Sequence, residues 1–197
     1  MTKRRALFFA SAALTGSSLL LPLWGFQMSA PQYPDESLHL TVTRTAIAGD
    51  VHEVTTLQKY IGVRFPQRIP ELRWLTPAIG ALATFLALAG LAGEGAGGRL
   101  IRVAAAASCL FFLAGSAVLL QKRLYDVGHE RDHNAPIRAV RDFTPPALGP
   151  VKVGNFTVWS YPHAGAAALL AAGLLAVAGA RARRPVPAAI GAQGAAA

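Results

Sequence analysis

The sequence is poor in charged residues and in cysteine, and each shortage excludes a class of protein. Charged residues make up 15% of the 197 residues, whereas soluble domains contain about a quarter. This balance indicates an integral membrane protein. The single cysteine, Cys109, excludes an internal disulfide and a metal site built from several cysteines. It stands among Ala, Leu and Phe, so we expect it to be a small buried hydrophobic residue.

Long apolar segments are what the sequence has in abundance. A membrane-spanning helix needs about 20 apolar residues. Four segments reach or approach that length, namely Ala6–Phe26, Trp74–Gly93, Leu100–Leu120 and approximately Pro162–Ala180. The basic start of the chain is also typical of a signal peptide. We expect an uncleaved anchor instead, because the first apolar run is too long and the best cleavage site is followed by Pro31.

Charged side chains and histidines are missing from the middle of the last three predicted spans; Arg102 lies near one end, where its side chain can reach the membrane surface. Transporters and pumps need ionisable residues inside the membrane, and haem held between helices needs histidines there. Both classes are therefore excluded. The fourth span instead carries a stripe of small residues, Ala168, Ala172, Ala176 and Ala180, which favours close helix packing within the protein or against a partner subunit.

The distribution of cations predicts the orientation in the membrane. With the N-terminus in the cytoplasm, the cytoplasmic pieces hold eight cations and one acid, and the two outer loops hold eleven cations and nine acids. This bias fits the positive-inside rule with both termini in the cytoplasm. It also accounts for the net charge of +9, so a nucleic-acid partner is not needed. We therefore expect a multi-pass protein of the bacterial inner membrane.

The two outer loops carry the patterns of a small folded domain. In the first loop, Leu38, Leu40 and Val42 alternate with polar residues, which predicts a strand. Asp50 then begins a segment with apolar residues at helical spacing. In the second loop the third helix is expected to continue to Gly128-His129, and a strand with a kink at Gly154-Asn155 follows. Neither loop has enough apolar surface to fold alone, so we expect one shared α+β domain outside the membrane.

The expected organisation has six parts. They are the N-terminus and first span (1–26), the first outer loop (27–73), a transmembrane hairpin joined by Gly93–Gly98 (74–120), the second outer loop (121–161), the fourth span (162–180) and a disordered cytoplasmic tail (181–197). The expected shared core of the outer domain is Leu38, Leu40, Val42, Val54, Leu57, Ile61, Val151, Val153, Phe156 and Val158.

Candidate metal ligands lie only in these outer loops. His129 and His133 stand four residues apart, but Gly128 and the following Asn-Ala-Pro argue against a helix through both. Asp50 and His52 form a second polar group. The alternative is a solvated loop in which Asp50 caps a helix and the histidines face water. No serine or cysteine lies in a nucleophile motif, so we expect no enzyme.

Several short motifs in the two loops resemble those of one known family. They are Ala30-Pro31-Gln32-Tyr33-Pro34, Gly49-Asp50 with Glu53, Tyr60-Ile61-Gly62, Tyr125 with Gly128-His129, Ala135-Pro136-Ile137, Phe143-Thr144-Pro145-Pro146 and Asn155-Phe156. They are similar to the small four-span bacterial membrane proteins encoded in atypical (clade II) nitrous-oxide reductase gene clusters, beside copper-handling lipoproteins and an ABC transporter. The resemblance covers about 30–63 and 125–162.

The resemblance implies a role in nitrous-oxide respiration or copper-enzyme maturation. The candidate metal ligands are His129, His52 and Asp50, of which His129 is the histidine that falls in a shared motif, and the candidates for docking a partner are Tyr33, Tyr60 and Phe143. One departure bears on copper. The family motif Asn-His-Tyr-Ile-Gly-Met is here Gln-Lys-Tyr-Ile-Gly-Val, so Lys59 and Val63 replace a histidine and a methionine, the side chains that a copper site uses.

Three functions follow from these observations. The first is a non-enzymatic membrane accessory protein whose periplasmic domain docks a copper or respiratory protein. The second is a copper-binding or metal-relay membrane protein. The third is a structural subunit of a membrane electron-transfer or transport complex. The sequence identifies no cofactor.

Overall fold

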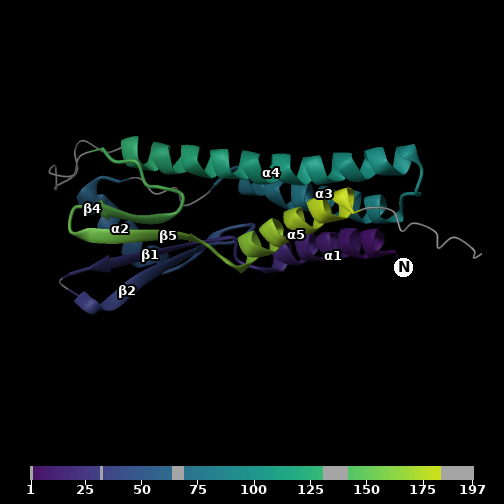
Figure 1. Ribbon diagram of the computed structural model, residues 1–197. Coiled ribbons are helices and arrows are strands. Elements are labelled where there is room, and N and C mark those ends of the chain that lie inside the picture. Colours follow the sequence, from purple (N-terminus) through teal and green to yellow (C-terminus); the bar gives the residue numbers. More distant parts are fainter. Residues whose placement is uncertain (1, 32, 64–68, 131–141, 183–197) are drawn as a thin grey trace, which may run out of the picture.

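The protein is elongated, with helices in one half and a β-sheet in the other (Figure 1). The computed structural model describes residues 2–31, 33–63, 69–130 and 142–182. The helices are α1 (Lys3–Ser17), α2 (Val51–Ile61), α3 (Leu72–Leu91), α4 (Ala96–His129) and α5 (Ala164–Arg181), with a short 3-10 turn η1 (Ser18–Leu20). The strands are β1 (Trp24–Ala30), β2 (Tyr33–Val42), β3 (Ile47–Gly49), β4 (Gly149–Val153) and β5 (Phe156–Pro162). The fold is therefore of the mixed α+β class.

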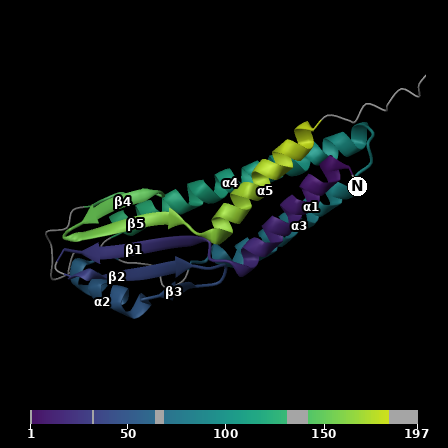
Figure 2. The ribbon, with the colours of Figure 1, turned by 60° about the horizontal axis from the view of Figure 1, so that its bottom comes forward.

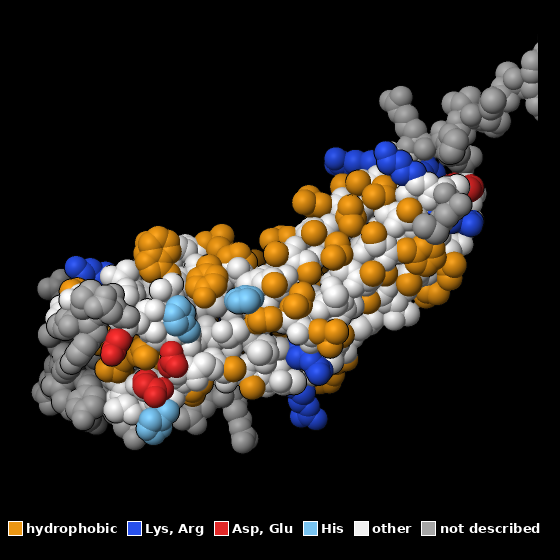
Figure 3. Space-filling model, turned by 90° about the horizontal axis from the view of Figure 1, so that it is seen from below, with side chains coloured by type: hydrophobic (Ala, Val, Ile, Leu, Met, Phe, Trp, Pro, Cys, Tyr) orange, Lys and Arg blue, Asp and Glu red, His pale blue; other side chains and the backbone are white. Residues whose placement is uncertain are grey.

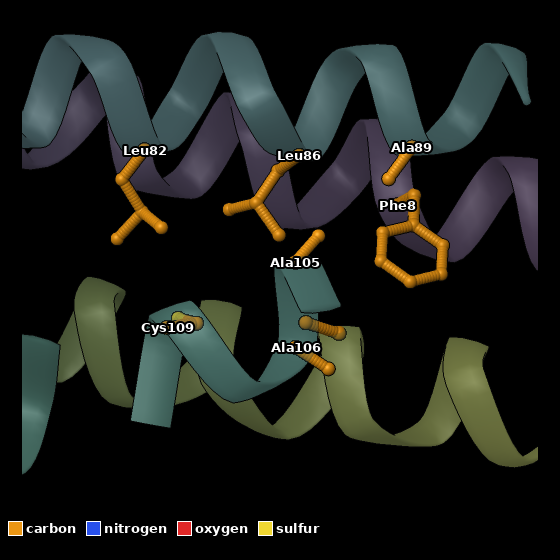
Figure 4. Packing of buried hydrophobic residues seen from close by; sticks show 8 residues of the cluster. Phe8, Leu82, Leu86, Ala89, Ala105, Ala106 and Cys109 are labelled. Atoms are coloured by element: carbon orange, nitrogen blue, oxygen red, sulfur yellow. The ribbon is translucent and has the colours of Figure 1, made fainter. Parts of the chain in front are cut away.

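The helical half is a bundle of α1, α3, α4 and α5. Helix α1 packs against α3 and α5, and α4 packs against α5 and α3. Figure 4 shows the core, in which Phe8 points between Ala89 and Ala106. Close approach depends on small residues: a Cβ on Gly179 would lie 2.9 Å from the Phe8 ring.

The small-residue stripe of α5 packs inside this bundle. Ala172 and Ala176 are fully buried. Ser11 of α1 donates a hydrogen bond of 2.7 Å to the carbonyl of Ala172, so the two helices meet along this stripe. The expected packing role of the stripe is thus fulfilled within the chain itself.

The sheet contains strands from both of the segments that were predicted to be outer loops. Its strand order is β3-β2-β1-β5-β4, and all pairs are antiparallel. Strand β1 lies in the centre, pairing Gln27 with His39 on one side and with Trp159 on the other. Strands β4 and β5 form a hairpin at Gly154-Asn155, where the sequence had indicated a kink in one strand.

The first helix is shorter than the Ala6–Phe26 span that we expected. It ends at Ser17, and the chain enters β1 at Trp24. Pro22 cannot continue a helix, and the residues beyond it alternate between the two faces of the sheet. In this register β1 forms hydrogen-bonded ladders with two neighbours, and these ladders satisfy its backbone groups.

One face of the sheet is covered and the other is open (Figure 2). On the covered face, Phe26 and Leu40 pack with Val54 of α2 and Leu124 of α4. Helix α4 reaches this position because it continues to His129, as the sequence predicted. The covered face therefore combines residues from both polar segments in one core. The side chain of Ile61, expected in that core, is outside the described residues.

Three helices in the described part of the chain, α3, α4 and α5, have the length and apolar composition needed to cross a membrane. Helix α1, with 15 residues, is not among them. Large apolar side chains are exposed on the helical half, including Leu88, Phe111 and Leu174. Lys and Arg side chains gather at the end of the helical half that lies away from the sheet (Figure 3).

Candidate functional site

Asp50 anchors the start of α2 to the sheet. Its carboxylate Oδ2 accepts a hydrogen bond of 2.7 Å from the backbone N–H of His39. Its own N–H donates to the carbonyl of His39 at 2.9 Å. The side chains of His39 and His52 are exposed, and the ring of His39 contacts the Ser37 hydroxyl at 2.8 Å. Asp50 thus already has a structural role in holding α2 against β2.

His129 is the last residue of α4, and its ring contacts a residue one turn earlier in the same helix. Its ring stacks on Tyr125, with centroids 3.8 Å apart and 17° between the planes. His129 Nδ1 lies 2.9 Å from the carbonyl oxygen of Tyr125. A carbonyl oxygen only accepts hydrogen bonds, so Nδ1 is the protonated nitrogen in this contact. In the neutral ring the other nitrogen, Nε2, then carries the lone pair.

The predicted metal ligands do not converge. Among the described residues, no three His, Cys, Asp or Glu side chains are placed to hold a metal ion. His129 ends α4, whereas Asp50 and His52 stand at the start of α2. His133, four residues after His129, is outside the described residues. A site at His129 would therefore need ligands from elsewhere.

Of the three docking candidates, the structure describes the side chain of Phe143. The side chains of Tyr33 and Tyr60 are outside the described residues. Phe143 is half-buried, and its backbone lies against the end of α4, where its N–H donates to the carbonyl of Gly128 at 3.4 Å. The side chain of Phe143 lines an internal pocket, so it contributes to the interior of the domain.

That pocket is apolar and encloses about 80 Å³. It lies between the covered face of the sheet, α2 and the outer end of α4. The lining residues are Phe26, Met28, Leu38, Leu40, Val54, Leu57, Val63, Leu124, Val127, Phe143, Pro145, Val151, Val153, Phe156, Val158 and Ser160. Most of the apolar core expected from the two loops is in this set, so the core surrounds a space.

A chain of hydrogen bonds fixes the one polar residue of the pocket. Trp24 Nε1 donates to the Ser160 hydroxyl at 2.8 Å, and that hydroxyl donates to the carbonyl of Ala147 at 2.7 Å. The side chain of Gln121 then pairs with the segment before β4, accepting from the N–H of Ala147 at 3.0 Å and donating to the carbonyl of Pro145 at 3.1 Å. These bonds tie β1, β5 and α4 together around the pocket.

An ion pair lies where α3 begins beside α4. Arg123 donates to Glu71 Oε1 through Nε at 2.9 Å, and a second donor of the same guanidinium reaches that oxygen. The hydrogen bond from Arg123 lowers the pKa of the Glu71 carboxyl below its usual value, against the opposing effect of burial. Both side chains are more than a third exposed, so water weakens the pair.

Three features of this domain escaped the sequence interpretation. The first three residues of β1, Trp24–Phe26, were included in the first predicted span, although Trp24, Phe26 and Met28 alternate with Gly25, Gln27 and Ser29. The pocket depends on the distance between packed elements, for which the sequence carries no signal. Trp159, 49% exposed on the open face of the sheet, was not among the docking candidates. Comparisons with known proteins found no match to a family model, a curated protein or a solved structure.

Proposed function

We propose that this protein is a non-enzymatic membrane accessory protein of the bacterial inner membrane, with the sheet domain on the periplasmic side, where it docks a partner. The division of the fold into an apolar bundle and a sheet domain is the observation that supports this proposal. Bulky apolar side chains exposed along the bundle favour contact with lipid. We infer that bilayer lipids surround α1, α3, α4 and α5.

The length of the first segment supports a fourth span. Helix α1 has 15 residues and η1 adds three. At about 1.5 Å per residue for an α-helix and about 2 Å for a 3-10 helix, together they extend roughly 29 Å. The hydrocarbon core of a bilayer is about 30 Å thick. Because the chain then enters β1, the sheet is held close to the membrane surface.

The polar contacts at the far end of the bundle support a cytoplasmic location for that end. Arg4 bonds Glu94 at 3.2 Å and also donates to the carbonyl of Ala182. Arg102 donates to the carbonyls of Ala92 and Gly93 at 3.0 and 3.1 Å. These bonds connect α1, the α3–α4 turn and the end of α5. Cations concentrated at one end of a bundle are typical of the cytoplasmic side.

The open face of the sheet is the proposed docking surface. Trp159 and its cross-strand neighbours Pro150 and Gln27 form its centre. Tryptophan residues at such positions often dominate the binding energy of protein interfaces. By the family resemblance described above, the proposed partner is a periplasmic respiratory or copper-handling protein.

Membrane integration is tested by fractionation. The full chain should remain in the membrane pellet after an alkaline carbonate wash and should be released only by detergent. Recovery in the soluble fraction would contradict the proposal at its first step.

Docking is tested by a photo-crosslinking residue placed at Trp159, with the same residue at Thr84 as the control. Both positions are exposed, but Thr84 lies on α3 in the apolar bundle. A protein adduct at 159, identified as an extracytoplasmic protein and absent at 84, supports docking by the sheet. A protein adduct at 84 alone would instead favour a structural subunit that contributes its helices to a complex.

A further inference from the structure

The pocket of the sheet domain has a composition that selects one class of ligand. Fifteen of its sixteen lining residues are apolar. They come from both polar segments of the sequence, so the pocket exists only when α2 and the end of α4 pack on the sheet. Its walls include Met28 and Val158 from the sheet, Leu57 from α2 and Val127 from α4.

Among the described lining residues, the one polar side chain already has hydrogen-bond partners. The Ser160 hydroxyl accepts from Trp24 Nε1 and donates to the carbonyl of Ala147. A water molecule in a cavity needs two to four polar partners, and the described lining residues offer no unused polar side chain. The pocket therefore favours an apolar occupant over water.

We propose that this pocket binds a single hydrocarbon chain, of the kind found in fatty acids and membrane lipids. Its volume of about 80 Å³ is roughly half that of an apolar cavity known to bind benzene. A short run of methylene groups fits such a space, whereas a ring system does not. The described lining residues offer no unused polar side chain for a head group, so we place the polar end of the ligand outside the pocket.

The source of the chain rests on the proposed membrane location. Strand β5 ends at Pro162 and α5 begins at Ala164, so the sheet follows the apolar bundle without a linker. A lipid of the adjoining leaflet is then the nearest source of a hydrocarbon chain. The binding chemistry of the pocket does not depend on that location.

Trp24 is a built-in reporter for the pocket. It packs against Phe26, Leu40, Val54 and Leu124, all of which line the pocket. In a Trp74→Phe, Trp159→Phe background Trp24 is the only tryptophan of the chain. Trp24 is hydrogen-bonded to the lining residue Ser160, and bromine on a bound chain quenches the fluorescence of a nearby tryptophan, so quenching of Trp24 measures occupancy.

The test titrates the full-length protein with terminally brominated fatty acids of increasing chain length. We expect saturable quenching, with an affinity that rises about fourfold per added methylene until the pocket is full. Val158→Phe and Leu57→Phe fill the pocket from the sheet and from α2, and each should abolish saturable quenching. Thr157→Phe is the matched control, because Thr157 neighbours Val158 on β5 but does not line the pocket.

Three outcomes decide the proposal. Saturable quenching that survives in Thr157→Phe and is lost in either folded filling variant supports it. Quenching that is equal in all variants, or absent throughout, overturns it, whatever the fractionation result. A second experiment uses nanodiscs made of chain-brominated phospholipid. If these nanodiscs quench Trp24 and the filling variants abolish that quenching, the bound chain belongs to a membrane lipid. If only the free fatty acid quenches Trp24, the ligand of the pocket is a single-chain molecule.

Discussion

At the scale of single residues, close approaches between backbone segments position the side chains of the sheet domain. Gly128 is the clearest example, because a Cβ there would lie 1.8 Å from the carbonyl oxygen of Phe143. The segment that crosses the end of α4 can lie so close only over glycine. That segment supplies Phe143 and Pro145 to the pocket. The absence of a side chain at position 128 therefore determines the position of part of the pocket wall.

The substitution Gly128→Ala should therefore destabilise the protein. The new methyl group must displace the backbone at Phe143, and overpacking of this kind costs about 1–3 kcal/mol. Thermal unfolding of the purified protein measures the effect. Gly115→Ala, in the same helix, is the control, because a Cβ there meets nothing within 4 Å and should be neutral or stabilising. Equal stability of the two variants would contradict this account.

A second prediction concerns the ion pair between Glu71 and Arg123. The pKa of the Glu71 carboxyl is lowered in the folded state, so its contribution to stability is present above the pKa of the unfolded chain, about 4.3. That contribution is lost as the pH falls through the lower, folded value. Because both groups are partly exposed, the coupling free energy should be about 0.2–1 kcal/mol.

A double-mutant cycle of Glu71→Gln and Arg123→Gln measures this coupling. It should be detectable at pH 7, should decline as the pH falls below the unfolded pKa of about 4.3, and should vanish once the pH has fallen through the lower folded pKa of Glu71. A coupling that is unchanged at acid pH would show that packing, and not charge, connects the two side chains.

A third prediction is that the isolated protein does not bind copper tightly. Tight sites need several converging donors, and His129, His52 and Asp50 are not brought together in the described structure. The sequence also has Lys59, which is no soft donor, and Val63, which has no donor atom, where the motif of the resemblance has histidine and methionine. Titration with Cu(I) against a competing chelator should show no stoichiometric uptake, and His129→Ala should not change the result. Stoichiometric uptake that His129→Ala removes would favour the metal-relay function instead.

At the scale of elements, strand β1 matters most, because it holds the two outer segments in one sheet. Its first three residues, Trp24–Phe26, were expected to complete the first membrane span. Inside an apolar run, helical and strand periods are hard to distinguish, and only the availability of two neighbouring strands settles the conformation. The pairing of β1 with β5 is therefore the test of this part of the fold.

Cysteines at Gln27 and Trp159 should form a disulfide on oxidation, in a Cys109→Ala background. The two residues are cross-strand partners, within the separation that a disulfide requires. The control places the second cysteine at Lys152 on β4, two strands from β1, at roughly 10 Å and beyond disulfide reach. Non-reducing electrophoresis distinguishes the two variants. Efficient cross-linking in the control alone would show that the β1 register is wrong.

At the scale of the whole molecule, the two halves are continuous, because α1 leads into β1 and β5 leads into α5. Backbone hydrogen bonds join the two junctions: His163 N–H donates to Leu23 at 3.1 Å, and Gly165 N–H donates to Pro22 at 2.7 Å. This arrangement leaves little freedom between bundle and sheet. A partner docked on the sheet would therefore be held in a fixed position relative to the bundle.

Reporter fusions test the proposed arrangement in the membrane. Fusions after Gly97 and after Ala197 should report the cytoplasm, and fusions near Pro70 and Pro150 should report the periplasm, because the cations favour the cytoplasmic side. The Pro70 fusion is the decisive one for α1. A cytoplasmic signal there would mean that α1 does not cross the membrane and that only the three longer helices can span it.

The sequence by itself determined the helices of the bundle and the existence of a folded α+β domain. Apolar runs of sufficient length predicted α3, α4 and α5, and the glycine-rich link predicted the turn before α4. Alternation around Leu40 predicted β2. These features depend on composition and on periods within one segment, which a single sequence displays directly.

Only the tertiary structure decided where α1 ends, which strands pair, and how the core surrounds a pocket. The conformation of Trp24–Ala30 depends on β2 and β5, which lie far along the chain. The position of Phe143 depends on the absence of a side chain at Gly128. The grouping of candidate ligands depends on distances between elements. Each of these is a property of contacts between remote segments, and local periodicity alone does not determine them.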